Sequence, residues 1–250
     1  MNTIGIVGGM GPYTGIDLIR KIFDQTRAKS DQDHLPVSML SIPHRIKDRT
    51  EFLLGKTNEN PAIFISEVIC SLHKGGASVV GMPCNTAHAE PIFKEIVKRI
   101  PKEVKLLNMI NEVALYIKEF HPSFVNIGIL STNGTFKAGI YPHYLSEHGL
   151  NAIQVTEKIQ VGNIHPAIYS KEYGIKSNAT FISNEAKRRI NIGIEYLVNR
   201  GAQAIILGCT EIPLAFKEGK INGISLIDPA RILARSLILE FSPGHLLQAD

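Results

Sequence analysis

The chain has 250 residues, of which 44% are hydrophobic and 20% are charged, and its formal net charge is +4. No apolar stretch reaches the roughly 20 residues that a membrane-spanning helix needs, so we expect no membrane partner. The basic residues are scattered, and the clusters Lys98-Arg99 and Lys187-Arg188-Arg189 fall in helical patterns typical of a solvated face. We therefore expect no nucleic-acid partner either.

The three cysteines of the chain are Cys70, Cys84 and Cys209, which contain no CxxC pair and are too few for a disulfide framework. The chain enters its first predicted strand directly after Met1-Asn2-Thr3, without the basic and apolar segments of a signal peptide. These two observations predict a cytoplasmic protein whose thiols stay reduced.

Predicted strands and helices alternate along the chain, which is typical of an α/β fold with mainly parallel sheets. The apolar runs predict strands at 3–8, 36–42, 77–83 and 104–108 in the first half, and at 124–131, 151–156, 203–208 and 224–227 in the second. Helices are expected in the gaps between them.

The clearest helix is predicted over 61–74. Asn60 can cap its first turn, Pro61 suits the first helical position, and Gly75-Gly76 follows its end. Its apolar residues recur at helical spacing, and Cys70 lies one position off that stripe, which indicates a packed, inert thiol. Further helices are expected over 86–99, from 212 and over 229–241.

The two halves of the chain resemble each other in sequence. A Gly-Ala pair stands eight residues before Cys84 and again eight residues before Cys209, with an apolar run between the pair and the thiol in both places. The first strands match as well, because Val7 lies 77 positions before Cys84 and Leu130 lies 79 positions before Cys209. This near-equal offset indicates a duplicated domain.

We predict two pseudo-symmetric α/β domains, each a mainly parallel sheet flanked by helices. The first is expected to comprise residues 1–113 plus 225–250 and to carry Cys84, and the second is expected to comprise residues 114–224 and to carry Cys209. The last helix has to cover apolar surface somewhere, and its return to the first domain would provide that.

Two thiols just past the carboxyl ends of buried strands suggest a paired acid and base. Removing a proton from a carbon next to a carboxylate leaves a nearly planar carbanion, and protonation of its opposite face inverts the centre. A thiol suits both roles because its ordinary pKa, about 8.5, is near neutrality. Backbone N–H groups at the following helix starts, with Asn85, Thr86 and Thr210, would hold anions there.

The chain resembles the aspartate/glutamate racemase family, and most closely its aspartate racemase branch. The segments that carry this resemblance are Gly8-Gly9-Met10-Gly11-Pro12, Met82-Pro83-Cys84-Asn85-Thr86-Ala87-His88 and Gly208-Cys209-Thr210-Glu211. The resemblance covers essentially the whole chain, and its specificity comes from the two cysteine motifs in this order and at this separation.

This resemblance implies a cofactor-independent amino-acid racemase with its active site in the cleft between two domains, acting on a small acidic amino acid as a homodimer. It implies that Cys84 and Cys209 are the acid/base pair and that Arg49, in a matching Asp-Arg-Thr segment, binds the side-chain carboxylate. Lys176 is implied as a second basic contact, although extra residues separate it from Ile168-Tyr169. The other candidate substrate-binding residues are Met10, Asn85, Thr86, Thr132, Thr135, Thr210 and Glu211.

Two cofactor alternatives fit the sequence less well. His88 could join Cys84, Cys209 and Glu211 as a metal ligand, but no second histidine has matched spacing and the equivalent position in the second half is Pro213. The glycine-rich start lacks the GxGxxG spacing of a dinucleotide-binding turn. We therefore expect neither metal nor organic cofactor, and Glu211 could instead tune the Cys209 thiol.

The leading functional hypothesis is PLP-independent racemisation of aspartate, or else of glutamate, to and from the D-amino acid. A decarboxylase or cis-trans isomerase of a related dicarboxylate is the second hypothesis, because those chemistries can use a single cysteine. A non-catalytic protein that binds an acidic ligand is the third. Aspartate and glutamate differ by one methylene, worth about 1–3 kcal/mol in a pocket, so the sequence leaves the substrate open.

Overall fold

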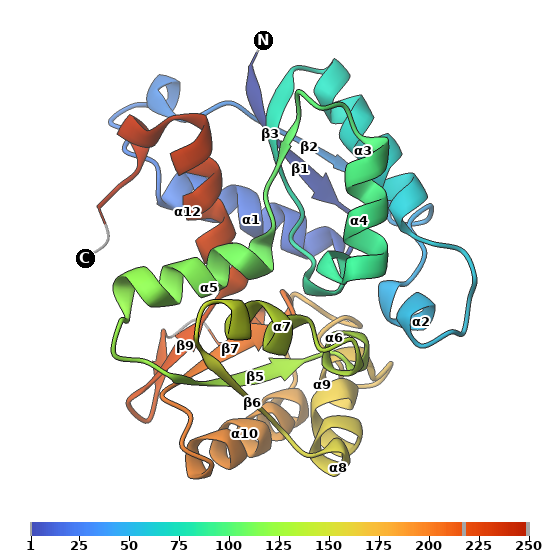
Figure 1. The fold of residues 1–250 in the computed structure, drawn as a ribbon, viewed down its shortest axis with the longest axis vertical. Helices are drawn as coiled ribbons and strands as arrows, with labels where there is room; N and C mark the ends of the chain where they lie inside the picture. Colours follow the sequence, from blue (N-terminus) through green and yellow to red (C-terminus); the bar gives the residue numbers. More distant parts are fainter. Residues whose placement is uncertain (1, 217–218, 249–250) are drawn as a thin grey trace. The chain divides into compact units, whose positions relative to one another are not determined.

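The computed structural model describes residues 2–216 and 219–248. The chain divides into two compact units (Figure 1). The first unit comprises Met1–Glu112 together with Ala230–Asp250, and the second comprises Val113–Pro229. Helix α5 (Met109–Phe120) carries the chain from the first unit into the second, and helix α12 (Pro229–Phe241) begins where the chain returns.

The first unit is built on a parallel sheet whose described strands lie in the order β2-β1-β3-β4. The strands are β1 (Thr3–Gly8), β2 (Val37–Ser41), β3 (Ala77–Gly81) and β4 (Lys105–Leu106). Its longer helices are α1 (Pro12–Asp24), α3 (Ala62–Lys74), α4 (Glu90–Arg99) and α12, and its short elements are η1 (Asp31–Asp33), α2 (Arg49–Leu53), η2 (Asn85–His88) and η4 (Pro243–His245).

Helices cover both faces of this first sheet, which explains why β1 is a continuous apolar run with every residue buried. On one face a Cβ at Gly5 would lie 3.6 Å from Leu72 of α3. On the other face a Cβ at Gly81 would lie 2.8 Å from Leu237 of α12. Glycine at these positions lets the backbones of sheet and helix approach closely.

The second unit is built on a sheet in the order β6-β5-β7-β9-β8, parallel except for β8, which runs antiparallel to β9. The strands are β5 (Asn126–Ser131), β6 (Asn151–Gln154), β7 (Ala204–Gly208), β8 (Lys220–Ile221) and β9 (Ile224–Ile227). The helices are α6 (Asn133–Lys137), α7 (Ile140–Glu147), α8 (Glu157–Ile159), the π-helical turn η3 (Gln160–Ile164), α9 (His165–Tyr169), α10 (Asn184–Asn199) and α11 (Ile212–Ala215).

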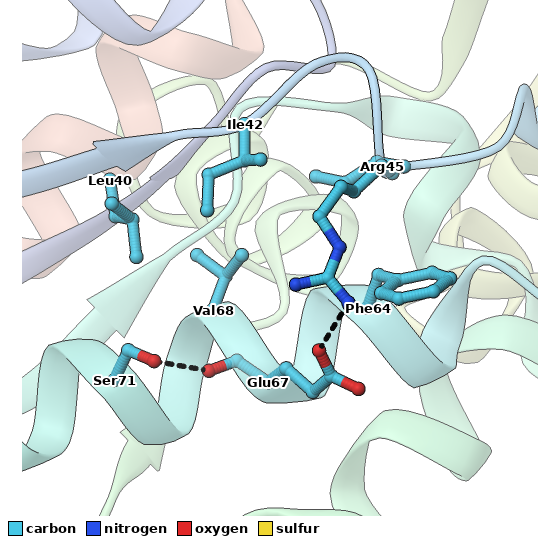
Figure 2. A pocket seen from close by; sticks show the side chains of 8 residues that line it. Leu40, Ile42, Arg45, Phe64, Glu67, Val68 and Ser71 are labelled. Atoms are coloured by element: carbon cyan, nitrogen blue, oxygen red, sulfur yellow. Dashed lines mark hydrogen bonds and ion pairs between the residues drawn. The ribbon is translucent and has the colours of Figure 1, made fainter.

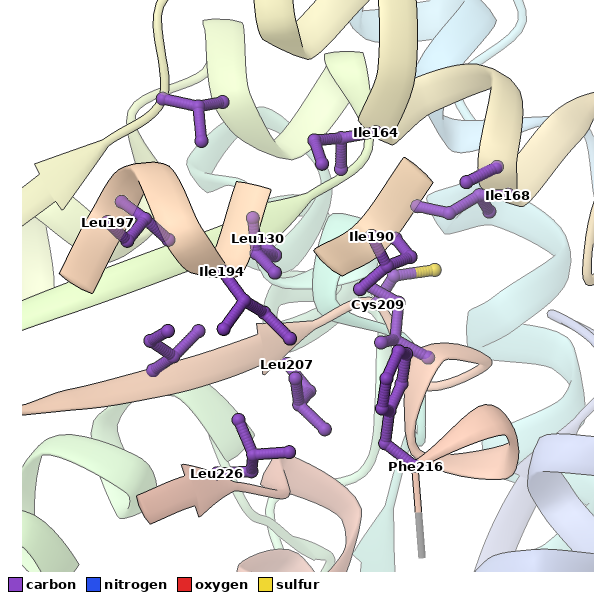
Figure 3. Packing of buried hydrophobic residues seen from close by; sticks show 14 of the residues in the cluster. Leu130, Ile164, Ile168, Ile190, Ile194, Leu197, Leu207, Cys209, Phe216 and Leu226 are labelled. Carbon is purple, nitrogen blue, oxygen red and sulfur yellow. The ribbon is translucent and has the colours of Figure 1, made fainter. Parts of the chain in front are cut away.

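The core of the second unit lies between its sheet and α10. Leu130, Ile190, Ile194 and Leu207 pack there, and Cys209 lies in the same cluster (Figure 3). On the opposite face, a Cβ at Gly208 would lie 2.9 Å from the buried ring of Tyr141 in α7. Successive residues of β7 therefore face different layers, and the thiol continues the α10-facing row.

The two sheets share one strand order, and this confirms the predicted duplicated α/β architecture. In each unit the first strand is central, with the second strand on one side and the third and then a fourth on the other. The strand over 224–227 is that fourth strand in the second unit, paired with β7. The predicted boundary between 224 and 225 therefore differs from the sheet pairing, in which β9 fills the place beside β7 that β4 has beside β3.

The local predictions differ from the structure mainly where helices begin. Helix α3 starts at Ala62, and the Asn60 side chain accepts a hydrogen bond from the Ala62 N–H at 2.9 Å. The single helix predicted over 86–99 is instead the turn η2 followed by α4. Pro91 explains the break, because it has no N–H to donate to the Ala87 carbonyl. Among the described residues, no helix is both long and apolar enough to cross a bilayer.

Candidate functional site

Cys84 stands three residues past the end of β3, at the carboxyl edge of the first sheet. Val80, Met82 and Cys84 belong to one apolar cluster, so the thiol is buried and only 6% of the residue is exposed. The backbone turns sharply here, with the Cys84 N–H donating to the Met82 carbonyl at 2.8 Å. The Cys84 carbonyl accepts from the Ala87 N–H at 3.2 Å, which begins η2.

His88 supports this turn from behind. Its ring is fully buried, stacks on Phe93 with centroids 5.3 Å apart, and places Nδ1 2.9 Å from the Cys84 carbonyl oxygen. Burial lowers the pKa of His88 to about 4, so the imidazole is neutral near pH 7 and donates through Nδ1. Within the described chain, no group of three or more His, Cys, Asp or Glu side chains is arranged to hold a metal ion.

The glycine-rich loop and Arg49 lie together in the first unit. Strand β1 neighbours β3, and the Thr14 hydroxyl bonds to both the Gly11 carbonyl at 2.8 Å and the Pro83 carbonyl at 3.3 Å. The Arg49 guanidinium, also buried, donates from Nη2 to the Met10 carbonyl at 3.4 Å. We call the residues Met10, Arg49, Cys84, Asn85 and Thr86 the first half-site; all are buried.

Cys209 is the residue directly after β7, at the carboxyl edge of the second sheet. It is 5% exposed and lies at one edge of the apolar cluster that includes Ile190, Leu207 and Phe216 (Figure 3). The Cys209 carbonyl accepts from the Ile212 N–H at 2.9 Å, so the chain turns into α11 directly after the thiol. This placement repeats that of Cys84 in the first unit.

A buried ion pair stands beside the Cys209 thiol. The thiol donates to Glu211 Oε2 at 3.0 Å, and the other carboxylate oxygen of Glu211 is paired with the Lys176 ammonium. The Glu211 side chain is 5% exposed and that of Lys176 is 23% exposed. The structure therefore brings Lys176 to the thiol's own carboxylate partner, despite the extra residues before it in the sequence.

The chain places Lys176 by folding back onto α9. The Lys176 N–H donates to the Ile168 carbonyl at 3.0 Å, and the Lys176 ammonium lies 5.5 Å from the centre of the Tyr169 ring. The return is tight, since a Cβ at Gly174 would lie 2.5 Å from backbone atoms of Ser170. Only glycine fits this close approach of two backbone segments.

The electrostatics around Cys209 favour its thiol form. Burial raises the pKa of Cys209 well above its ordinary value, the Glu211 carboxylate raises it further, and Lys176 partly opposes them. Burial alone would lower the pKa of Lys176, but the attraction of Glu211 outweighs burial and keeps it above its usual range. Lys176 is therefore a cation, and Glu211 beside it is a carboxylate.

The predicted threonines lie at the same sheet edge as Cys209. Ser131 of β5 is in register with Gly208 of β7, so Thr132 follows one strand end and Thr210 follows Cys209 at the next. The Thr132 hydroxyl accepts from the Thr135 N–H at 3.3 Å and caps α6. We call the residues Thr132, Thr135, Lys176, Cys209, Thr210 and Glu211 the second half-site.

A racemase family model matches most of the chain. The model described as Asp/Glu/Hydantoin racemase covers residues 7–237. The chain belongs to the Asp/Glu/Hydantoin racemase family. This match confirms the predicted resemblance.

Three members or structures illustrate the likeness to this racemase family. The structure of the Picrophilus torridus aspartate racemase is 32% identical, with a TM-score of 0.81, and the match covers 99% of this chain and 96% of that one. The broad specificity amino-acid racemase RacX of Bacillus subtilis is 25% identical over 243 residues, 94% of this chain and 96% of the relative. The glutamate racemase of Carboxydothermus hydrogenoformans is 29% identical over 197 residues, 77% of this chain and 67% of the relative.

The first unit of this racemase-family chain also has a pocket away from its thiol. It lies between β2 and α3, where Arg45 stacks over the Phe64 ring at 4.5 Å and pairs with Glu67 at 3.3 Å (Figure 2). Its remaining lining residues are Leu40, Ile42, Ile46, Val68 and Ser71. None of the predicted site residues lines it, so it has no part in the candidate site.

Two residues that the sequence did not single out bond to the residues on either side of Thr132 in the second half-site. Gln160 is buried and donates to the Ser131 carbonyl and to Asn133, and His165 accepts from the Asn133 N–H. Both residues belong to the π-helical turn and the helix start after it, where the apolar spacing of an ordinary α-helix is interrupted. No local sequence signal marks them, because their partners lie about 30 residues earlier in the chain.

Proposed function

We propose that this chain racemises an acidic amino acid, with aspartate as the first candidate and glutamate as the second, by moving the α-proton between Cys84 and Cys209 without a cofactor. One observation carries the proposal: two buried thiols stand at equivalent strand ends of two sheets with the same strand order. Each thiol is followed by a tight turn with polar side chains, which suits an anionic substrate.

The proposed reaction moves protons only between the two cysteine sulfur atoms and the substrate Cα. A thiolate on one side takes the Cα proton, and the thiol on the other side gives its proton to the opposite face of the carbanion. Because burial and Glu211 favour the thiol form of Cys209, we assign Cys209 as the proton donor of the resting protein and Cys84 as the base. The reverse reaction exchanges these roles.

Charge at the half-sites fits a dicarboxylic amino acid. We assign the distal carboxylate to Arg49 and Lys176, since a guanidinium can engage a carboxylate through two parallel hydrogen bonds. The α-carboxylate is assigned to the hydroxyl and amide donors Asn85, Thr86, Thr132, Thr135 and Thr210. Glu211 has the charge to bind the α-ammonium group when the substrate carboxylate takes over part of its pairing with Lys176.

Aspartate is placed first because the aspartate racemase of Picrophilus torridus matches the whole chain at 32% identity. A glutamate racemase and a broad specificity racemase match it as well, so the substrate panel has to be wider than one amino acid. We further propose a cytoplasmic homodimer, in which a reducing environment keeps all three cysteines as free thiols. Size-exclusion chromatography with light scattering tests the dimer.

Proton NMR in D₂O tests the reaction directly. The purified, reduced protein is incubated without any cofactor with L-aspartate, L-glutamate and their D-forms, and the loss of the α-proton signal is followed together with the appearance of the other enantiomer. Exchange with inversion supports the proposal and names the substrate. Silence with all of them would overturn it and favour the two remaining hypotheses.

The same NMR assay, with other substrates, distinguishes the two remaining hypotheses. Turnover of an amino-free dicarboxylate such as a substituted malonate or maleate would indicate a decarboxylase or a cis-trans isomerase. Binding of aspartate with no α-proton exchange would indicate a ligand-binding protein. Cys84→Ala and Cys209→Ala variants, checked for folding by circular dichroism, then show whether both thiols are required. Of the three hypotheses, only the two-base reaction requires both.

A further inference from the structure

Gln160, the first residue of the π-helical turn η3, is hydrogen-bonded to the carboxyl end of strand β5. It is 1% exposed, and its Nε2 donates to the Ser131 carbonyl at 2.9 Å and to Asn133 Oδ1 at 3.0 Å. A carbonyl oxygen only accepts hydrogen bonds, so the atom that faces it has to be the amide nitrogen. The orientation of the Gln160 amide is thereby fixed, and one side chain ties together the residues on either side of Thr132.

His165 holds the same loop from the other end of the π-helical turn. Its Nδ1 accepts from the Asn133 N–H at 3.3 Å, and its ring stacks on Tyr169 with centroids 4.7 Å apart. The segment from Ser131 to Asn133 therefore has bonds to the turn through a carbonyl, a side chain and an N–H. π-Helical turns of this kind are rare, and they occur frequently at functional sites.

Thr132 is the residue that these bonds enclose. Its hydroxyl is buried, accepts from the Thr135 N–H and also lies 3.3 Å from the Thr135 hydroxyl. Both hydroxyls belong to the second half-site, beside the strand end that carries Cys209. Binding groups have to be held within a fraction of an ångström to be effective, and they rely on such supporting contacts for it.

We propose that Gln160 is a positioning residue for substrate binding, which holds Thr132 and Thr135 in place through its bonds to Ser131 and Asn133. This inference rests on the proposed function, because it assigns those two threonines to the substrate's α-carboxylate. Gln160 itself acts through the loop and not on the reacting atoms. Its loss is expected to weaken substrate binding more than it slows the proton transfer.

The chain supplies a control at the opposite end of the same strand, where an exposed glutamine makes similar bonds. Gln203 accepts at Oε1 from the Val125 N–H at 2.7 Å and from the Asn126 N–H at 2.9 Å, where β5 begins. Gln203 therefore ties the amino end of β5 by side chain to backbone bonds, as Gln160 ties the carboxyl end. Replacement of either glutamine by methionine removes those bonds while keeping a similar side-chain volume.

The experiment compares Gln160→Met with Gln203→Met in two measurements. Hydrogen–deuterium exchange by mass spectrometry should show faster exchange of peptides covering 131–137 in Gln160→Met and of peptides covering 124–127 in Gln203→Met. With the best substrate, Gln160→Met should raise KM about tenfold with kcat changed less than about threefold, and Gln203→Met should leave KM unchanged.

A milder variant guards against misfolding of Gln160→Met. Asn133→Ala removes one acceptor of the Gln160 amide, keeps the bond of that amide to the Ser131 carbonyl, and should raise KM by about threefold. Unchanged exchange over 131–137, or an unchanged KM in both Gln160→Met and Asn133→Ala, would overturn the inference. If the wild type exchanges no α-proton, the proposed function fails, and the exchange measurement still decides whether Gln160 holds the loop.

Discussion

The two half-sites lie at equivalent strand ends of the two sheets, but different side chains surround their thiols. Two residues after Cys84 the chain has Thr86, and two residues after Cys209 it has Glu211; four residues after each thiol stand His88 and Pro213. The first thiol is therefore supported by a neutral ring bonded to its own carbonyl, and the second by a buried ion pair bonded to its sulfur. Duplication provides the symmetry of position, and these few side chains make the two thiols unequal.

The largest expected effect comes from removing either thiol. Cys84→Ala and Cys209→Ala should each lower racemisation by about 10²–10⁴-fold or more, because inversion needs a proton-transfer group on both faces of Cα. The assay is a coupled or chiral chromatographic measurement of the D-amino acid formed. Cys70→Ala is the control, since Cys70 lies on α3 with its sulfur 4.0 Å from the Arg99 carbonyl, and it should keep wild-type activity.

Loss of activity in only one of the two alanine variants would contradict the two-base proposal. Strong asymmetry is the pattern of a reaction that uses a single cysteine, such as decarboxylation. Exchange of the α-proton with deuterium without inversion, in either alanine variant, would support the two-base proposal. The remaining thiol can still remove and return a proton on its own face of Cα.

The ion pair offers the next largest effect. Glu211→Gln removes a negative charge beside Cys209 and should lower the pKa of that thiol, whereas Lys176→Met removes a positive charge and should raise it. Both variants should lose about 10–100-fold in activity. Lys176→Met should also lower the free energy of unfolding by about 3–5 kcal/mol, because it leaves Glu211 buried without its cation.

The pKa of Cys209 can be measured from the pH dependence of its alkylation by iodoacetamide in a chain that also carries Cys70→Ala and Cys84→Ala. Two further ionisable side chains lie near this thiol and are unchanged in every variant: Tyr141, behind the strand end, and Tyr169, beside Lys176. Glu185→Gln serves as the control, because it breaks ion pairs with Arg188 and Arg189 at the exposed start of α10. An identical alkylation profile in Glu211→Gln and in Glu185→Gln would refute the role given to Glu211.

We predict that the stability of the protein depends on pH through His88, whose ring bonds to the Cys84 carbonyl of the first half-site. Its pKa is about 4 when folded and 6.5 when exposed, so the unfolded chain binds a proton more readily than the folded chain. Above pH 6.5 the group contributes nothing; as the pH falls from 6.5 to 4 it should lower the free energy of unfolding by on the order of 3 kcal/mol. Urea denaturation between pH 7.5 and 4.5 measures this.

His88→Gln is the variant that isolates the effect. It loses the stacking on Phe93 and should be less stable than the wild type near pH 7, but its stability should fall less steeply as the pH is lowered, by about one bound proton. An equal slope in the variant and the wild type would show that His88 does not titrate as its burial implies. No histidine term is expected from the second half-site, because the residue four positions after Cys209 is Pro213.

The contrast between the half-sites also explains what the sequence could predict. The strands, the duplication and the two thiols follow from apolar runs and Gly-Ala pairs, which are local patterns. The ion pair of Lys176 with Glu211 and the bonds of Gln160 depend on a chain that folds back over about 30 residues, so no local pattern contains them. The pairing of β9 with β7 has no local signal for the same reason, since strand order is a property of the whole sheet.

The smallest expected effect tests whether backbone geometry alone places Lys176. Gly174→Ala should lower the free energy of unfolding by about 1–3 kcal/mol and raise KM modestly, because the added Cβ would meet Ser170 backbone atoms at 2.5 Å and push the returning segment away from α9. Gly162→Ala is the control, since a Cβ there meets no atom within 4 Å. Thermal unfolding and steady-state kinetics of the pair decide it: equal behaviour would mean that the Glu211 carboxylate, and not the tight return, holds Lys176 at the thiol.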